Sequence, residues 1–174
     1  FELRPDNIDE ILDGFAPDVI FLDPARRSST GGKVFRLEDC SPNLLELADP
    51  LLDRASKIVA KLSPMADISL TCKQLEDCGV SVPRVHVVGA SGECKELLVE
   101  IGKASQADRE IFVVEEGGTF RFPISEEKDA PPSIVGKDEP FKGRILFEPG
   151  KTLMKAGAYN LLCRNGLKKL GRST

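Results

Sequence analysis

The sequence has little of what several functional classes require. It contains one histidine, His86, no tryptophan, and no C-x-x-C pair among its five cysteines, so we expect no metal site. No stretch approaches the ~20 consecutive apolar residues that cross a bilayer, and we expect no membrane partner. The first residue is Phe1 rather than methionine, which we interpret as part of a longer chain. The thiols are scattered, as is typical of a reducing, cytoplasmic location: Cys40, Cys72, Cys78, Cys94 and Cys163.

Charge is distributed unevenly along the chain. The 174 residues carry 24 basic and 28 acidic side chains, a formal net charge of −4, yet residues 151–174 contain no acidic side chain. A basic end on an acidic body indicates contact with a polyanion, and the alternative is an ordinary solvated helix face. The basic residues of this end are Lys151, Lys155, Arg164, Lys168, Lys169 and Arg172.

Residues 19–24 are the most informative short stretch of the sequence. Residues 19–22 (VIFL) are a continuous apolar run, which is typical of a strand buried on both faces of a parallel sheet. The run stops at Asp23-Pro24, because proline cannot donate a ladder hydrogen bond. Open α/β sheets bind ligands at the carboxyl ends of their strands, so we expect a site where Asp23 follows the strand.

Strands alternate with helices over the first 105 residues, which predicts a mainly parallel α/β sheet closed by one antiparallel hairpin. Each helix has its own start signal, such as Ser41-Pro42, Asp49-Pro50 or the capping residue Asp67. The predicted elements are a helix at 7–14, a strand at 18–22, two short helices beginning at 41 and 49, a strand at 57–62, a helix at 67–79, and a hairpin of 85–88 with 96–101.

The pattern changes after residue 105, which predicts a first domain at 1–105 and a second, small α+β module at 106–174. Gly117-Gly118 is a hairpin signal between two strand-like runs. The predicted elements of the module are strands at 110–115 and 119–124, a loop at 125–142, a strand at 144–147, a helix at 152–164, and a last strand at 167–170.

An acidic residue followed by proline at a strand end is suited to positioning an amine. The Asp23 carboxylate and the Pro24 carbonyl can each accept a hydrogen bond from a substrate N–H, and such positioning can lower a barrier by several kcal/mol, roughly 7–11 at best. Arg26 and Arg27 add planar donors that suit phosphate. The plain alternative is an aspartate that caps a turn beside two surface arginines.

Five stretches of the sequence carry a resemblance when they are taken together. They are PDVIFLDPARRSSTGGKVFRLEDCSPNL at 17–44, IVAKLSPMADI at 58–68, VHVVGASGECKELLV at 85–99, LFEPGKTLMKAGAYNLL at 146–162 and GLKKL at 166–170. These stretches resemble S-adenosylmethionine-dependent methyltransferases that carry a THUMP-like C-terminal domain. The resemblance implies the C-terminal half of a Rossmann-like class I methyltransferase sheet, followed by a small ferredoxin-like and THUMP-like module.

The same resemblance implies site residues. Asp23, Pro24, Ala25 and Arg26 would form the catalytic loop that grips the target base. The neighbouring substrate-binding residues would be Arg27, Lys61, Ser63 and Pro64. The cofactor would be S-adenosylmethionine, held by a glycine-rich loop that we expect upstream of this chain. THUMP domains present RNA, which implies RNA binding by Lys155, Arg164, Lys168, Lys169 and Arg172.

Departures from the family pattern indicate which kind of base atom accepts the methyl group. Alanine and arginine stand where the target loop of DNA N6-adenine enzymes has a second proline and an aromatic residue. RNA uracil-C5 enzymes carry a nucleophilic cysteine just after the next strand, where this chain has Lys61-Leu62-Ser63-Pro64. Cys72, the nearest thiol, is expected to be a buried hydrophobe, and His86 a core residue. Transfer to a nucleobase amine in RNA therefore fits best.

Two other interpretations remain open from the sequence. The chain could be a non-catalytic module that binds nucleic acid or protein on a Rossmann-like scaffold, or a scaffold that has lost activity. If the chain is half of a sheet, it also exposes an unpaired sheet edge, through which a homo-oligomer could form.

Overall fold

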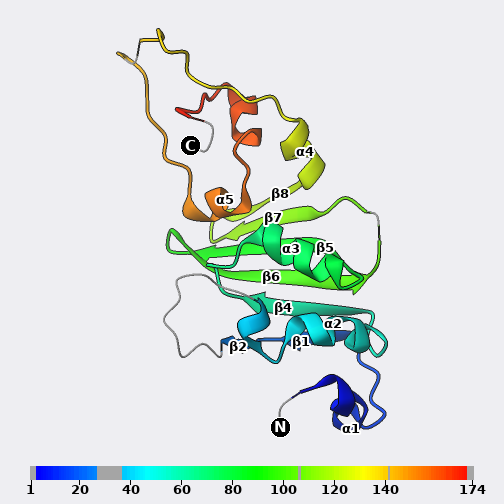
Figure 1. Ribbon diagram of the computed structural model, residues 1–174. Coiled ribbons are helices and arrows are strands. Elements are labelled where there is room, and N and C mark those ends of the chain that lie inside the picture. Colours follow the sequence, from blue (N-terminus) through cyan, green and yellow to red (C-terminus); the bar gives the residue numbers. More distant parts are fainter. Residues whose placement is uncertain (1–2, 27–36, 106, 141, 172–174) are drawn as a thin grey trace.

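The computed structural model describes residues 3–26, 37–105, 107–140 and 142–171, and its centre is a six-stranded sheet (Figure 1). The strand order is β1-β4-β6-β5-β7-β8. Strands β1, β4, β5 and β7 run in one direction, and β6 and β8 run antiparallel to their neighbours. The sheet is therefore a mixed α/β sheet with four co-directional strands.

The first strand lies at one edge of the sheet. A 3-10 turn η1 (Pro5–Asn7) and the short helix α1 (Ile8–Leu12) precede β1 (Val19–Leu22). Within the described residues, β1 pairs with β4 alone, and this pair is parallel. The side chains of Val19 and Phe21 are 44% and 59% exposed, whereas Leu22 is buried. The prediction that this run is buried on both faces is therefore wrong for these residues, because Val19 and Phe21, two residues apart, point to the same, exposed face.

A two-stranded ribbon follows at the end of β1. Strand β2 (Ala25–Arg26) pairs antiparallel with β3 (Cys40–Ser41), and the 3-10 turn η2 (Leu37–Asp39) leads into β3. Arg27 lies outside the described residues. The ribbon joins the end of the first strand to the start of the next helix.

Helix α2 (Leu44–Leu52) differs from its prediction in two ways. Asn43, rather than Ser41, caps it, and the Asn43 side chain accepts a hydrogen bond from the Leu45 N–H at 3.1 Å. The helix also continues through Pro50, although two helices were expected. Its apolar face buries enough side chains to outweigh the hydrogen bond that proline removes: Leu44, Leu47, Ala48, Leu51 and Leu52.

The next strand and helix agree with the sequence pattern. Strand β4 (Lys57–Leu62) has the alternating burial of a strand with one face on the core. Asp67 caps α3 (Ile68–Asp77), with 2.8 Å between its Oδ1 and the Leu70 backbone nitrogen. The predicted hairpin is also present, as β5 (Val80–Ala90) and β6 (Glu93–Lys103), both longer than expected.

The sheet continues beyond residue 105. Strand β7 (Glu110–Glu115) pairs parallel with β5, and β8 (Gly118–Pro123) forms the predicted hairpin with β7. The described parts of both segments share one sheet, and the division into two domains at 105 stays a prediction.

Four predictions for the C-terminal segment are wrong in detail. The expected loop at 125–142 begins with helix α4 (Ile124–Asp129), and residues 144–147 are not in a strand. The expected helix at 152–164 is α5 (Lys151–Ala156) followed by a 3-10 helix η3 (Leu161–Asn165), because Gly157 adopts φ +79° and ends α5. The expected last strand is a single bridge between Ile134 and Lys169.

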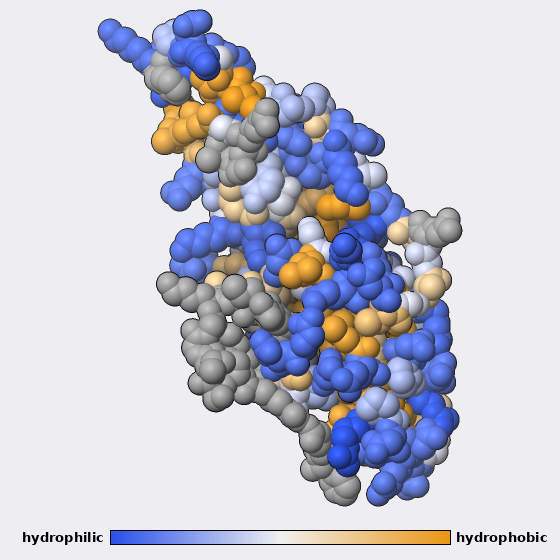
Figure 2. All heavy atoms as spheres, viewed as in Figure 1, coloured by the Kyte–Doolittle hydropathy of each residue, from blue (hydrophilic) through white to orange (hydrophobic). Residues whose placement is uncertain are grey.

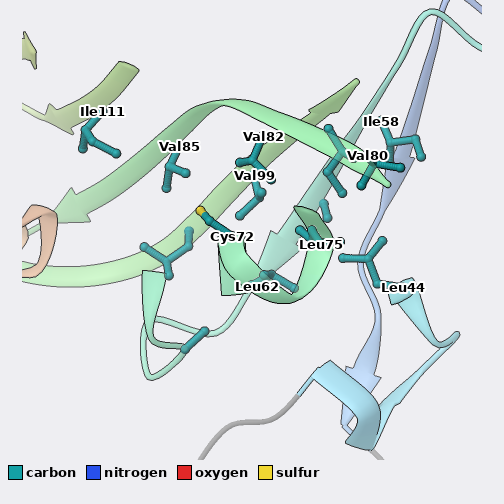
Figure 3. Close-up of a cluster of buried hydrophobic side chains, with 14 of the residues drawn as sticks. Leu44, Ile58, Leu62, Cys72, Leu75, Val80, Val82, Val85, Val99 and Ile111 are labelled. Atoms are coloured by element: carbon teal, nitrogen blue, oxygen red, sulfur yellow. The ribbon is translucent and has the colours of Figure 1, made fainter. Parts of the chain in front are cut away.

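The core lies between the sheet and the helices. Figure 3 shows its centre, where Cys72 and Leu75 of α3 point at the strand residues Val82, Val85 and Val99. Apolar residues also remain at the surface, and Figure 2 shows hydrophobic residues gathered toward the upper left, in the C-terminal part of the molecule. The segment before α5 contributes Ile145, Leu146 and Phe147, which are all exposed.

Candidate functional site

The parallel pairing of β1 with β4 brings the predicted site residues to one edge of the sheet. Leu22 is in register with Ala60, so Asp23 and Lys61 follow side by side at the carboxyl ends of their strands. Ser63 and Pro64 come next after β4. The parallel register therefore places the Asp23-Pro24 and Ser63-Pro64 turns at the same edge of the sheet.

Asp23 and Lys61 form an ion pair. The Lys61 Nζ lies 2.6 Å from the Asp23 Oδ2, and the Asp23 side chain is 55% exposed. The hydrogen bond to Asp23 raises the pKa of Lys61. The same nitrogen lies 3.8 Å from Oε1 of Glu96 on β6. Three neighbouring strands thus present a carboxylate, an ammonium and a second carboxylate in a row, and Glu96 was not singled out from the sequence.

The backbone after Asp23 is directed by the β2–β3 ribbon. Pro24 is half-buried and Ala25 is exposed, and Ala25 is in register with Ser41. Arg26 is in register with Cys40. The ribbon limits how the peptide after Asp23 can turn, so the Asp23 carboxylate and the Pro24 carbonyl hold a defined relation to the sheet. The partner strand β3 gave no recognisable signal in the sequence, because two residues are too few for a period.

The turn after β4 is held by its own serine. The Ser63 Oγ accepts a hydrogen bond from the Met65 N–H at 3.2 Å, and the Ser63 carbonyl accepts one from the Ala66 N–H at 3.0 Å. Met65 is exposed at the tip of this turn. Ser63 therefore shapes the edge, and the apolar Met65 beside it is a further surface residue that sequence reasoning missed.

The comparisons with known proteins gave one match. The chain has a TM-score of 0.73 and 34% sequence identity to a crystal structure of a "putative methyltransferase" from Porphyromonas gingivalis W83. The match covers 95% of this chain and 40% of that chain, so this chain spans less than half of the solved protein. The chain has a methyltransferase-like, Rossmann-like α/β fold. No family model matches the sequence, and no curated protein matches it.

In a methyltransferase-like fold, the Asp23 edge is where the reacting groups would meet. The described residues contain no glycine-rich loop that precedes β1, and Gly14, at φ +76°, follows the helix α1 instead of a strand.

Two residues considered as catalysts have structural environments. Cys72 is 1% exposed, and desolvation raises its pKa to about 11, which agrees with its interpretation as a buried hydrophobe. His86 is half-buried on β5, with its Nε2 2.9 Å from Glu100 Oε1 and its ring stacked on Phe112 at 4.8 Å. His86 is level with Lys61, since both are in register with Leu98 of β6, but it lies on β5 at the far side of that strand.

The predicted RNA-binding residues that the structure describes make contacts within the chain. Lys155 lies on α5, and its Nζ donates to the Ala66 carbonyl at 2.6 Å. Arg164 pairs with Glu126, and Lys168 pairs with Glu139 at 2.7 Å. Lys169 donates to the side chain of Asn160, and Arg172 lies outside the described residues. Each described member thus has a partner within the chain, and exposed pairs of this kind are weak enough to open.

Neither a metal-binding cluster nor a membrane-spanning helix is found among the described residues. In the ranges 3–26, 37–105, 107–140 and 142–171, no group of three or more His, Cys, Asp or Glu residues is placed to hold a metal ion. Across those same ranges, every helix is too short or too polar to cross a lipid bilayer.

Proposed function

We propose that this chain is the target-positioning part of an S-adenosylmethionine-dependent methyltransferase that acts on a nucleobase amine in RNA. The observation that carries the proposal is the meeting of Asp23 with Lys61 and Ser63 at the carboxyl edge of a methyltransferase-like sheet. The solved neighbour supports methyl transfer as the reaction. We infer the amine and the RNA from the sequence and from the residues at this edge.

Asp23 and Pro24 would orient the target. The Asp23 carboxylate accepts one N–H of the amine, and the Pro24 carbonyl accepts the other, so the nitrogen lone pair is aimed along one direction. S-adenosylmethionine supplies an electrophilic methyl group when it is bound. Holding two reactants in line is the main source of rate in such a site. The backbone at Arg26 continues the loop, and its guanidinium and that of Arg27 would contact phosphate.

The burial of the Cys72 thiol favours direct attack by nitrogen over a mechanism that uses this cysteine as a nucleophile. Cys72 is buried and its pKa is about 11, so its thiolate is scarce at neutral pH. A carbon target would need such a nucleophile beside Asp23. An exocyclic amine needs only acceptors, and these are the groups that the edge offers.

The cofactor would be held largely by residues outside positions 1–174. The exposed β1 edge supports this part of the proposal, because parallel strands are ordinarily buried on both faces and Val19 and Phe21 here are not. The solved neighbour is also a much longer chain, of which this one covers 40%.

Calorimetric titration with S-adenosylhomocysteine tests the cofactor. Residues 1–174 are compared with a chain extended upstream by about 150–200 residues, on the order of one domain. Binding to the extended chain alone agrees with the proposal. Binding to neither chain contradicts it, and leaves a non-catalytic binding module on the same scaffold as the better interpretation.

Replacement of Asp23 tests the loop. In the full-length protein, Asp23→Ala should abolish methyl transfer to RNA while RNA binding, measured by filter retention, stays nearly unchanged. Lys57→Met is the control, because Lys57 lies on the same strand as Lys61 but pairs with Glu100 at the other end of it. Loss of RNA binding in Asp23→Ala would assign Asp23 a structural role instead.

A further inference from the structure

Helix α5 touches the candidate site from the C-terminal part of the chain. We propose that Lys155 is a positioning residue that fixes the turn Ser63–Ala66 by donating to the Ala66 carbonyl, so that the C-terminal segment sets the geometry of the target-binding edge. The proposal rests on the proposed function, because it assumes that the turn after β4 contacts the target. It assigns Lys155 a role different from the phosphate contact that the sequence suggested.

The contact is short and sheltered. The Lys155 Nζ lies 2.6 Å from the Ala66 oxygen, Lys155 is half-buried, and Ala66 is fully buried. A charged donor to a carbonyl in such a place is stronger than the same bond in water, because few solvent molecules compete for it. The bond joins residues that are far apart in the sequence. In Figure 1, α5 and β2 both lie toward the left of the view.

The turn that Lys155 holds is the one that carries the predicted substrate residues. The Ala66 N–H donates back to the Ser63 carbonyl, and the Ser63 hydroxyl accepts from the Met65 N–H. Ser63, Pro64 and Met65 thus lie in the short segment of chain between the end of β4 and Ala66, which Lys155 holds. A shift of Ala66 would move all three, whereas the start of α3 is capped separately by Asp67.

Helix α5 is itself fixed by close packing on the sheet. Thr152 is buried against Gly89 of β5, where a β-carbon added to Gly89 would lie 2.1 Å from the Thr152 Oγ1. Ala156 is also buried, and Gly157 ends the helix directly after it. The close packing of Thr152 on Gly89 places the backbone of α5, and with it the base of the Lys155 side chain, relative to β5.

A phosphate contact and a positioning role predict different kinetic changes when Lys155 is replaced. A phosphate contact strengthens RNA binding, so its loss raises KM, leaves kcat unchanged and reduces the slope of log affinity against log salt by about 1. A positioning residue acts on the bound complex. Its loss lowers kcat, leaves KM nearly unchanged and leaves the salt slope as it was.

The kinetic experiment uses the full-length protein with methyl-labelled S-adenosylmethionine and bulk cellular RNA as the acceptor. Lys155→Met removes the donor, Lys155→Arg keeps one, and Lys151→Met removes the same charge from an exposed site on the same helix. We expect kcat to fall about 10-fold or more in Lys155→Met with KM within about twofold, and to recover in Lys155→Arg, since misplacement by about 1 Å can cost ~100-fold. Higher KM with unchanged kcat, or no change at all, overturns the proposal.

A second experiment does not need activity. Hydrogen exchange at the amides of Met65 and Ala66 should quicken about 10-fold or more in Lys155→Met, and stay as in the wild type in Lys151→Met. Unchanged exchange in Lys155→Met overturns the proposal even in an active enzyme. If the wild-type protein transfers no methyl group, the proposed function fails, and the exchange measurement alone decides whether Lys155 holds the turn.

Discussion

The Lys61 ammonium and the Asp23 carboxylate lie 2.6 Å apart across two adjacent parallel strands. Within the described residues, this ion pair uses one oxygen of the Asp23 carboxylate, Oδ2. Lys61 is thereby placed to hold the rotamer of Asp23, in addition to any contact with a substrate. This relation makes Lys61 the first residue to test beside Asp23.

We predict that Lys61→Met lowers methyl transfer about fivefold, the equivalent of the ~1 kcal/mol that an exposed pair contributes at most. Lys61→Arg should retain most of the activity, because it keeps the pair with Asp23. The free energy of unfolding, from urea denaturation, should change by less than about 1 kcal/mol in both variants. Lys57→Met, on the same strand, serves as the control, and an equal loss in that variant would contradict a specific role for Lys61.

Cys72 provides a prediction about mechanism. Its thiol is buried and its pKa is about 11, so a thiol reagent under native, mildly alkaline conditions should modify the exposed Cys78 and leave Cys72 unmodified. Cys72→Ala should keep methyl transfer within about twofold, since no covalent intermediate is expected. Complete loss of transfer in a folded Cys72→Ala protein would point to a cysteine nucleophile.

Glu127 of α4 provides a prediction about stability. Its carboxylate, only 8% exposed, accepts the N–H groups of Asn160 and Leu161 at 2.8 and 2.9 Å. Glu127→Ala leaves both amides without this acceptor, so we expect a loss of about 2–3 kcal/mol in the free energy of unfolding. The neighbouring Glu126→Gln removes only a surface pair with Arg164 and should cost less than about 1 kcal/mol. Equal effects of the two substitutions would contradict the assignment.

Glu139 provides a prediction about pH. Hydrogen bonds from Lys168, the Gly136 N–H and Arg144 lower the pKa of Glu139 from 4.5 to about 2. Because the folded-state pKa lies below the unfolded value, the ionised carboxylate stabilises this segment above about pH 4.5, and the contribution disappears as the pH falls toward about 2.

The protection of the Gly136 amide against exchange, relative to the intrinsic rate at each pH, should therefore decrease in the wild type as the pH falls over that range. Glu139→Gln should remove the pH dependence of this protection. A titration of the Glu139 carboxyl near its ordinary value, followed by NMR, would show that the three donors do not hold it.

The exposed edge at β1 predicts self-association. Residues 1–174 should associate more strongly with rising concentration, as followed by sedimentation velocity, because an unpaired edge with apolar Val19 and Phe21 can pair with a second copy. Phe21→Lys should reduce the association. Ile145→Lys, at an exposed site elsewhere, is the matched control, and an equal reduction there would assign the association to general hydrophobicity.

Local patterns predicted the elements whose signals lie within a few residues. The strand at Lys57–Leu62, the Asp67 cap and the hairpin between Val85 and Ile101 were all predicted, because each depends on neighbours in the sequence. The predicted strand at 144–147 failed for the converse reason. Its apolar residues match a strand pattern, but in the described structure they have no sheet partner, and a strand exists only by pairing.

The candidate site, too, was predicted only in part from the sequence. The sequence alone predicted that strands end at Asp23-Pro24 and Ser63-Pro64, because proline cannot donate a ladder hydrogen bond. The rule is not absolute, since β5 continues through Pro83 with a register shift. Only the tertiary structure decided that Lys61 contacts Asp23 and that Lys155 reaches Ala66. Such contacts depend on strand register and on the packing of Thr152 against Gly89, and long-range packing of this kind leaves no periodic trace in the chain.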